Sequence, residues 1–337
     1  MMVSVVMPVY NGAKYLQNSI DSILNQTFWD FEFIIVNDGS TDETTNILNE
    51  NQARDNRIKV IHLKENAGVA NARNVGVWAA QGKWIAIQDS DDISVPHRLE
   101  TQLNYVEEHK DPVAVGSMIK CIPGRYSVDK DFQAYLKNTE KWSNALLTRE
   151  QIKGNRFIST PVVNGSVLFL KEIFMKVGGY NKNYRIGEDF DLWIKMLEYG
   201  PIDKIPEVLY HYRVDADSLC HENDVVTCSY LMKIACKHIN EMFTQQTGKK
   251  PKFLVLGTKE GCHYILKTVV PEVGINVLQY FYLNTRKSLD KIVKQFFQKK
   301  ADGIIILDSA HSGEYLQYFE SKGLVMNENL FRLWNVF

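Results

Sequence analysis

The chain has 337 residues, of which 45% are hydrophobic and 23% are charged. This composition is typical of a globular protein with a full core, and it excludes a chain that is disordered throughout. Because 39 Lys and Arg balance 40 Asp and Glu, the formal net charge is −1, and no overall positive field favours a nucleic-acid partner.

Over the first 120 residues, short apolar strands alternate with amphipathic helices. The expected strands are Val3–Met7, Phe31–Val36, Ile58–Leu63, Lys83–Gln88 and Pro112–Lys120. The expected helices are Ala13–Asn25, Asp42–Gln52, Val69–Gln81 and Pro96–His109. This alternation is typical of βαβ units and predicts an α/β fold, with a mostly parallel sheet and helices on both faces.

The pattern is weaker after residue 120, where residues 121–160 are expected to form loops with one or two helices. Further strands are expected at Val162–Leu170 and Val208–Val214, and helices at Lys171–Val177, Phe190–Tyr199 and Val225–Phe243. Gln245–Lys252 is a basic hinge. We therefore predict a first domain over residues 1–224, a helix and basic linker over 225–250, and a separate module over 251–337.

A second, shorter alternation follows the hinge. Its expected strands are Phe253–Leu256, Asn276–Leu283 and Gly303–Leu307, and its expected helices are Gly261–Val270, Leu289–Gln298 and Gly313–Lys322. This indicates a small C-terminal α/β module that is Rossmann-like in its order of elements. The module lacks a G-x-G-x-x-G turn, so its role stays open.

Polar and acidic residues follow four N-terminal strands at the points where those strands end. Because the carboxyl ends of parallel strands share one edge of a sheet, these residues are expected to form a ligand site there. Each turn taken alone would be an ordinary cap or loop. The segments are Pro8-Val9-Tyr10-Asn11, Asn37-Asp38-Gly39-Ser40, Asn66-Ala67-Gly68 leading to Arg73, and Asp89-Ser90-Asp91-Asp92.

Two acidic groups stand out among the candidate residues. The carboxylates of Asp89–Asp92 repel one another unless a cation or hydrogen bonds offset their charge, and short carboxylates of this kind suit Mg²⁺ or Mn²⁺. Glu188 and Asp189 follow Gly187 at the start of a helix. The helix dipole favours acidic residues there, and such a carboxylate can also act as a general base.

In chain order, these segments and Gly187-Glu188-Asp189-Phe190-Asp191-Leu192-Trp193 resemble family 2 of the glycosyltransferases. The resemblance covers about residues 1–215, and it implies the GT-A fold and an inverting reaction. It further implies that the first domain is catalytic, with Asp189 taking the proton of the acceptor hydroxyl. The implied ligand contacts are Pro8, Tyr10 and Asp38 to the nucleobase, Arg73 and Asp89 to the rest of the nucleotide, and Asp91 to Mg²⁺ or Mn²⁺.

The chain departs from the family pattern near the end of its first domain. Many relatives carry a histidine after a final Tyr-Arg pair, whereas Asp215 stands at the expected place here, two residues after Arg213. Asp215 or His211 could take over a metal contact, while Asn164 and Glu188 lie where donor or acceptor contacts are often made.

The function that the resemblance implies is transfer of a hexosyl or N-acetylhexosaminyl group from a nucleotide-sugar, usually a UDP-sugar. The acceptor would be a glycan or lipid-linked glycan in surface polysaccharide biosynthesis. A non-catalytic scaffold that retains the fold is the alternative, and a sugar nucleotidyltransferase is disfavoured because no glycine-rich basic loop follows the first strand.

The expected location is the cytoplasm. The five cysteines form no C-x-x-C pair, which fits a reduced protein, and no apolar run approaches the roughly 18 residues of a membrane span. Peripheral contact with the inner face of the membrane stays open, as does association between copies of the chain.

Overall fold

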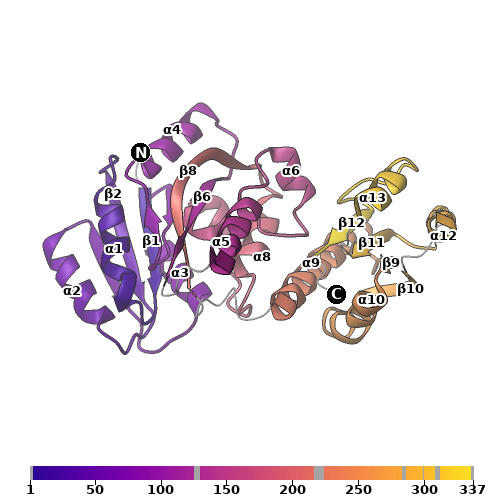
Figure 1. Cartoon of the computed structure of the whole chain (residues 1–337), viewed down its shortest axis with the longest axis horizontal. Helices are drawn as coiled ribbons and strands as arrows, with labels where there is room; N and C mark the ends of the chain where they lie inside the picture. Colours follow the sequence, from indigo (N-terminus) through magenta and orange to yellow (C-terminus); the bar gives the residue numbers. More distant parts are fainter. Residues whose placement is uncertain are drawn as a thin grey trace. The chain divides into compact units, whose positions relative to one another are not determined.

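The computed structural model describes residues 3–124, 130–215, 224–282, 286–298, 300–307 and 312–334. The chain divides into two compact units (Figure 1). Unit 1 comprises Met1–Lys153 and Thr160–Leu219, and unit 2 comprises Gly154–Ser159 and Cys220–Phe337. Within the described ranges, no helix combines the length and apolar character needed to cross a bilayer.

Unit 1 is built on one sheet with the strand order β3-β2-β1-β4-β7-β6-β8-β5. Its strands are β1 (Val3–Val9), β2 (Phe31–Asn37), β3 (Ile58–His62), β4 (Trp84–Ile87), β5 (Ile93–Ser94), β6 (Ala114–Pro123), β7 (Leu168–Leu170) and β8 (Ile202–Val214). Its helices are α1 (Ala13–Leu24), α2 (Thr44–Arg54), α3 (Val69–Ala79), α4 (Arg98–Glu108), α5 (Lys130–Ser143), α6 (Arg149–Gly154), the 3₁₀ turn η1 (Asn164–Ser166), α7 (Lys171–Lys176) and α8 (Glu188–Met196).

The direction of the strands decides where the candidate residues lie. β1 is parallel to both β2 and β4, and β2 is parallel to β3. β7 runs antiparallel to β4 and β6, and β5 runs antiparallel to β8. The mostly parallel, mixed sheet expected from the sequence is therefore confirmed, and the carboxyl ends of β1, β2 and β4 lie at one edge.

Alternating side chains of the sheet fill two separate cores. Val3, Val5 and Met7 of β1 pack with α1, α2 and α4, whereas Val6 of the same strand packs with α3, α7 and α8. Neighbouring residues of a strand point to opposite faces, so β1 contributes to both cores. Helices consequently cover both faces of the sheet (Figure 1).

The continuous strand expected over Val162–Leu170 is wrong. Residues Asn164–Ser166 form η1, and only Leu168–Leu170 pair as β7. Crowding explains the turn, because a Cβ built on Gly165 would lie 2.2 Å from the Tyr210 hydroxyl on β8. The apolar residues at both ends of this stretch resemble a strand, but its centre is shaped by that close approach.

Unit 2 contains a second sheet, which is fully parallel and has the order β10-β9-β11-β12. The expected small α/β module is therefore confirmed, with one strand more than predicted, the short β12. Its strands are β9 (Lys252–Gly257), β10 (Asn276–Tyr282), β11 (Gly303–Leu307) and β12 (Leu330–Leu333). Its helices are α9 (Asp224–Thr247), α10 (Lys259–Tyr264), the π-helical turn η3 (Ile265–Val269), α11 (Val270–Val273), α12 (Arg286–Phe297) and α13 (Ser312–Glu320).

Aromatic side chains join α9 and the insert 154–159 to the sheet of unit 2. The ring of Phe243 on α9 lies 5.5 Å from that of Phe253 on β9, and Phe157 of the insert lies 5.8 Å from Phe331 on β12. Such edge-to-face pairs stabilise a core beyond the area they bury. The six residues 154–159 thus belong to unit 2, although the chain returns to unit 1 after them and stays there until Leu219.

We expect the Gly76→Ala variant to lose about 2 kcal/mol of unfolding free energy, because overpacking a core usually costs more than alanine adds to a helix. The added Cβ would lie 2.4 Å from Val6 Cγ1 and 3.2 Å from Val36 Cγ2. Urea denaturation would measure the loss. Gly154→Ala is the control, since no atom lies within 4 Å of its added Cβ, and equal stability of the two variants would contradict this packing of α3 on β1.

Candidate active site

Arg73 joins three of the sequence-predicted segments in one buried ion-pair cluster. From α3, its guanidinium donates to Asp89 Oδ1 at 2.8 Å and to Glu188 Oε1 at 2.7 Å. Arg73 is only 7% exposed. Although burial opposes its charge, Asp89 and Glu188 raise the pKa of Arg73 above its ordinary value. The cluster therefore holds the end of β4 beside the start of α8.

Asp189 follows Glu188 at the start of α8 and is half-buried. Gly187, whose φ of 83° is in the left-handed region, turns the chain into this helix. Burial and the negative charge of Glu188 raise the pKa of Asp189 to about 7, while Arg73 opposes the shift. Its Oδ1 accepts from the Phe190 backbone N–H at 2.7 Å. The site thus holds a carboxylate that can exchange a proton near neutral pH.

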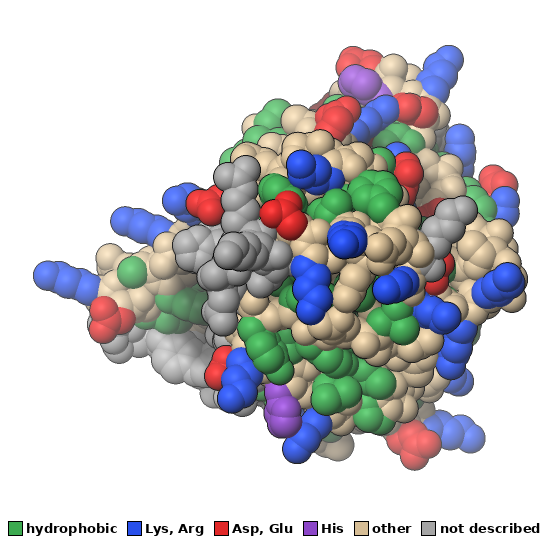
Figure 2. All heavy atoms as spheres, turned by 90° about the vertical axis from the view of Figure 1, so that its right-hand side faces the viewer, with side chains coloured by type: hydrophobic (Ala, Val, Ile, Leu, Met, Phe, Trp, Pro, Cys, Tyr) green, Lys and Arg blue, Asp and Glu red, His purple; other side chains and the backbone are tan. Residues whose placement is uncertain are grey.

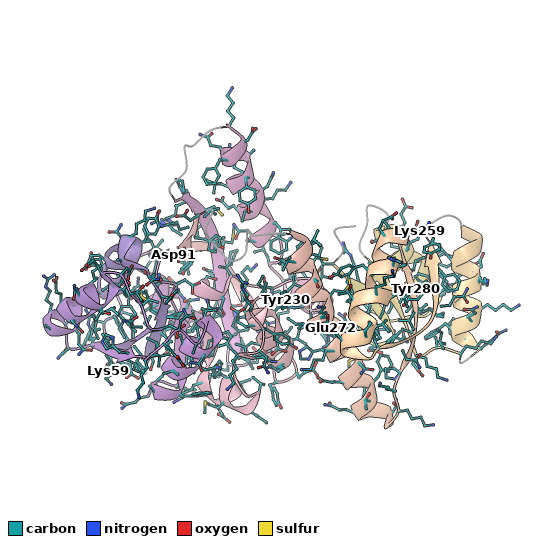
Figure 3. All side chains as sticks on the ribbon, turned by 90° about the horizontal axis from the view of Figure 1, so that it is seen from below. Lys59, Asp91, Tyr230, Lys259, Glu272 and Tyr280 are labelled. Carbon is teal, nitrogen blue, oxygen red and sulfur yellow. The ribbon has the colours of Figure 1, made fainter. Side chains whose placement is uncertain are left out.

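Asp91 lies in the turn that follows β4 (Figure 3). Burial raises its pKa to about 6, and the negative charges of Asp89 and Asp215 add to the shift. Arg213 opposes the shift and donates from Nε to the Asp91 backbone carbonyl at 2.7 Å. Three acidic side chains, two from this turn and Asp215 from beyond the end of β8, therefore act on one another at this place.

The end of β8 is fixed onto the acidic turn. The Arg213 backbone N–H donates to Asp92 Oδ1 at 2.6 Å, and its guanidinium lies 4.2 Å from the centre of the Tyr15 ring. The Tyr15 hydroxyl in turn donates to Asp215 Oδ2 at 3.2 Å. Arg213 thus contacts the turn directly, whereas Asp215 is bonded to Tyr15, whose ring lies against Arg213.

A hard divalent ion fits the oxygen donors at this turn. No group of three His, Cys, Asp or Glu side chains with metal-holding geometry occurs in the part of the chain that the structure describes. Mg²⁺ is commonly bound by only one or two carboxylates together with substrate phosphates. The crowded charges of Asp91, Asp89 and Asp215 suit such a partly formed site, since a cation would offset their repulsion.

The three residues expected at the nucleobase lie at the ends of β1 and β2. Pro8 is inside β1 and buried, whereas Tyr10 is 50% exposed just beyond it. Asp38 is 2% exposed, and its carboxylate accepts from the backbone N–H groups of Ala67 and Gly68, both at 2.9 Å. Asp38 therefore fixes the position of the loop that leads to α3.

Asn164 presents an amide group beside the Arg73 cluster. Its Oδ1 accepts from the Tyr180 hydroxyl at 2.8 Å, and the ring of Tyr180 lies 5.6 Å from the Arg73 guanidinium. The Asn164 Nδ2 atom is buried and has no partner among the described residues. A buried donor without a partner is unfavourable, so a bound ligand would be its natural acceptor.

His211 does not face the acidic turn. Its neighbour Tyr210 points toward the turn, because the Tyr210 hydroxyl accepts from the Asp89 backbone N–H at 3.1 Å. Adjacent residues on a strand point to opposite faces, and His211 pairs across the sheet with Lys120. Burial and Lys120 lower the pKa of His211. Asp215 is therefore better placed than His211 for a cation at this turn.

The sequence did not point to the residues that hold the acidic turn in place through hydrogen bonds. Arg98 of α4 is fully buried and donates to Gln88 Oε1, Ser94 Oγ, Gln102 Oε1 and the carbonyls of Ile87 and Val167, over 2.9–3.3 Å. The Gln88 side chain donates to the carbonyls of Asp89 and Asp92 at 3.1 and 3.0 Å. Arg98 itself gives no signal, since arginine at a helix start is normally solvated.

The fold is similar to that of glycosyltransferases with the GT-A architecture. A sequence model described as "Glycosyl transferase family 2" matches residues 4–178. The chain belongs to this family.

Similar sequences carry the same class of name. An uncharacterized glycosyltransferase from Methanocaldococcus jannaschii is 34% identical over 254 residues, which are 74% of this chain and 80% of the relative. Glycosyltransferase GlyG from Streptococcus pneumoniae is 30% identical and matches 71% of this chain and 80% of its own. The chain covers a smaller share of two other relatives. It matches 65% of the length of an uncharacterized glycosyltransferase from Haemophilus influenzae and 36% of one from Rickettsia bellii.

Solved structures share the fold at low sequence identity. S. aureus TarS 1–349 in complex with UDP-GlcNAc has a TM-score of 0.54 and 20% identity, over 71% of this chain and 66% of that one. The mannosyltransferase PcManGT from Pyrobaculum calidifontis, in complex with GDP-Man and Mn²⁺, has a TM-score of 0.52 and 16% identity, over 96% and 80%.

We expect Arg98→Lys to lower the unfolding free energy by about 3 kcal/mol, because one ammonium cannot satisfy five acceptors and buried groups left unpaired cost about 1–3 kcal/mol each. Burial disfavours the charged guanidinium and lowers the pKa of Arg98 to about 10. The buried charge therefore depends on these hydrogen bonds for its stabilisation. Urea denaturation measures the effect. The control is Arg54→Lys on α2, where the arginine side chain is 69% exposed, and a loss no greater than that of the control would show that the network is dispensable.

Proposed function

We propose that the protein transfers a hexosyl or N-acetylhexosaminyl group from a nucleotide-sugar to a hydroxyl of a glycan or lipid-linked glycan, with inversion. The observation that carries this proposal is the pairing of Arg73 with Asp89 and Glu188, which sets Asp189 beside the acidic turn. A UDP-sugar is the proposed donor, and the complex of TarS with UDP-GlcNAc supports it. Surface polysaccharide biosynthesis is the proposed setting.

Asp189 is proposed as the general base. A hydroxyl is a poor nucleophile, and a carboxylate with a pKa of about 7 accepts its proton more readily than an ordinary aspartate would. As the proton passes to Asp189, the acceptor oxygen bonds to the anomeric carbon. The bond from that carbon to the diphosphate oxygen breaks, and its electron pair leaves with the diphosphate. A single displacement inverts the anomeric centre and needs no covalent intermediate.

The remaining residues of the site bind and orient the substrates. Arg73 holds Asp89 at the end of β4, where the nucleotide would bind, and the unpartnered Asn164 Nδ2 would donate to the sugar or to a phosphate oxygen. Asp91, with Asp89 and Asp215 nearby, would hold Mg²⁺ or Mn²⁺. When bound, that ion supplies positive charge for the departing diphosphate.

Asp189→Asn should lower kcat/KM by roughly a hundredfold to ten-thousandfold, the usual contribution of a general base. In the wild type, the base is active when deprotonated, so kcat/KM should rise with pH up to about 7 and then level off. Release of nucleoside diphosphate across a pH series measures both effects. Unchanged turnover in Asp189→Asn would instead favour the scaffold alternative.

Glu188→Gln gives the base assignment a second, independent readout. Removing this negative charge favours the ionised form of Asp189, so the acid limb of the pH profile should move to lower pH. A limb that stays in place would show that another group titrates. Glu198→Gln, an exposed position in the turn after α8, is the matched control and should leave the limb unmoved.

Asp91→Asn should abolish the gain in UDP affinity that Mn²⁺ provides over EDTA in calorimetric titrations. The variant should fold at least as well as the wild type near neutral pH, since ionised Asp91 is disfavoured by burial and by Asp89. Asp30→Asn, at an exposed aspartate before β2, should keep the full effect of Mn²⁺. An equal Mn²⁺ effect in Asp91→Asn and the wild type would contradict the proposed role of Asp91.

A further inference from the structure

The near-zero net charge hides a strongly basic segment in unit 2. Residues 286–300 contain six Lys and Arg and one Asp, so these 15 residues carry a formal charge of +5. Lys291 and Lys294 of α12 and Lys300 beyond it are exposed. Within the described residues, neither Lys294 nor Lys300 forms an ion pair. The charges of Lys294 and Lys300 are therefore presented to solvent rather than balanced inside the unit.

Only one side of α12 packs onto the sheet. Leu289 and Ile292 are buried in the core that the helix shares with β9, β11 and α13. Residues 291, 294 and 298 recur at helical spacing and are all exposed, so they define the outer side. Lys291 and Lys294 lie on this outer side, and the Lys291 ammonium is 5.9 Å from the centre of the Phe281 ring.

An exposed aromatic side chain lies next to these lysines. Phe297 at the end of α12 is 56% exposed, and it follows Lys294 by three positions, about one helical turn. Figure 2 looks at the end of the molecule that carries unit 2 and shows hydrophobic, Lys and Arg side chains close together on its surface.

We propose that this face, formed by Lys291, Lys294, Phe297 and Lys300, binds the surface of a membrane that contains anionic lipids. Lysines near such a surface are attracted to its negative charge, and an exposed aromatic side chain gains by entering the interface. A soluble polyanion would use the lysines and leave Phe297 in water. A second copy of the chain in a two-fold contact would bring the two sets of lysines together, which repulsion opposes.

Cosedimentation with vesicles tests the proposal without nucleotide or acceptor, so its outcome is independent of the proposed function. The full-length protein should bind vesicles of phosphatidylcholine and phosphatidylglycerol in equal parts, and bind pure phosphatidylcholine much more weakly. Lys291→Glu/Lys294→Glu should reduce binding about tenfold or more, since each lysine near an anionic surface contributes severalfold. High salt should weaken binding by the wild type. Phe297→Ser should reduce it severalfold at any salt concentration.

Lys110→Glu/Lys137→Glu is the matched control, because it makes the same change in net charge at exposed lysines of unit 1. It should bind nearly as the wild type does. Equal loss in both double variants, or no preference of the wild type for anionic vesicles, would overturn the proposal. Light scattering completes the test: a dimer that Phe297→Ser dissociates would assign this face to a second copy instead. Thermal unfolding of each variant shows whether it is folded.

Discussion

The buried guanidinium of Arg73 is the constraint on which the site depends. It is paired with Asp89, sixteen positions along the chain, and with Glu188, a further 99 positions on. Removing one partner from such a cluster leaves a buried charge uncompensated, which is strongly unfavourable. The cluster therefore fixes the end of β4 and the start of α8 together, and with them the acidic turn and Asp189. It also moderates Asp189, because Glu188 raises its pKa and Arg73 lowers it.

A second buried arginine supports the same turn by a different means. Among the described residues, Arg98 has no carboxylate hydrogen-bond partner and is held by carbonyl, amide and hydroxyl oxygens instead. Neutral acceptors compensate its burial less fully, which is why its pKa is lowered while that of Arg73 is raised. Arg98 acts through Gln88, whose amide binds the carbonyls of Asp89 and Asp92. The turn is thus fixed by a paired charge on one side and by a network of hydrogen bonds on the other.

Sequence patterns predict the parts of this site better than its assembly. The alternation of strands and helices placed Asp38 and Asp89 at one edge, because parallel strands must end there together. No local pattern could show that Glu188 reaches Arg73, since that contact depends on β7 and β8 entering the sheet out of chain order. The same limit explains the wrong strand over Val162–Leu170 and the missed Arg98, which are set by close packing against β8 and by tertiary hydrogen bonds. The small module after residue 250 was predictable as α/β, whereas its edge strand β12 is too short to show a period.

We propose that these residues assemble a nucleotide-sugar-dependent inverting transferase. The most direct measurement is to incubate the protein with a panel of UDP-, GDP- and dTDP-sugars and candidate glycan acceptors, and to determine the anomeric configuration of the product by NMR. We expect turnover with one donor class, most of all UDP-sugars, and a product whose anomeric configuration is opposite to that of the donor. A product that retains the donor configuration would contradict a single displacement assisted by Asp189, and a folded protein that consumes no donor with any acceptor would contradict the assignment as a transferase.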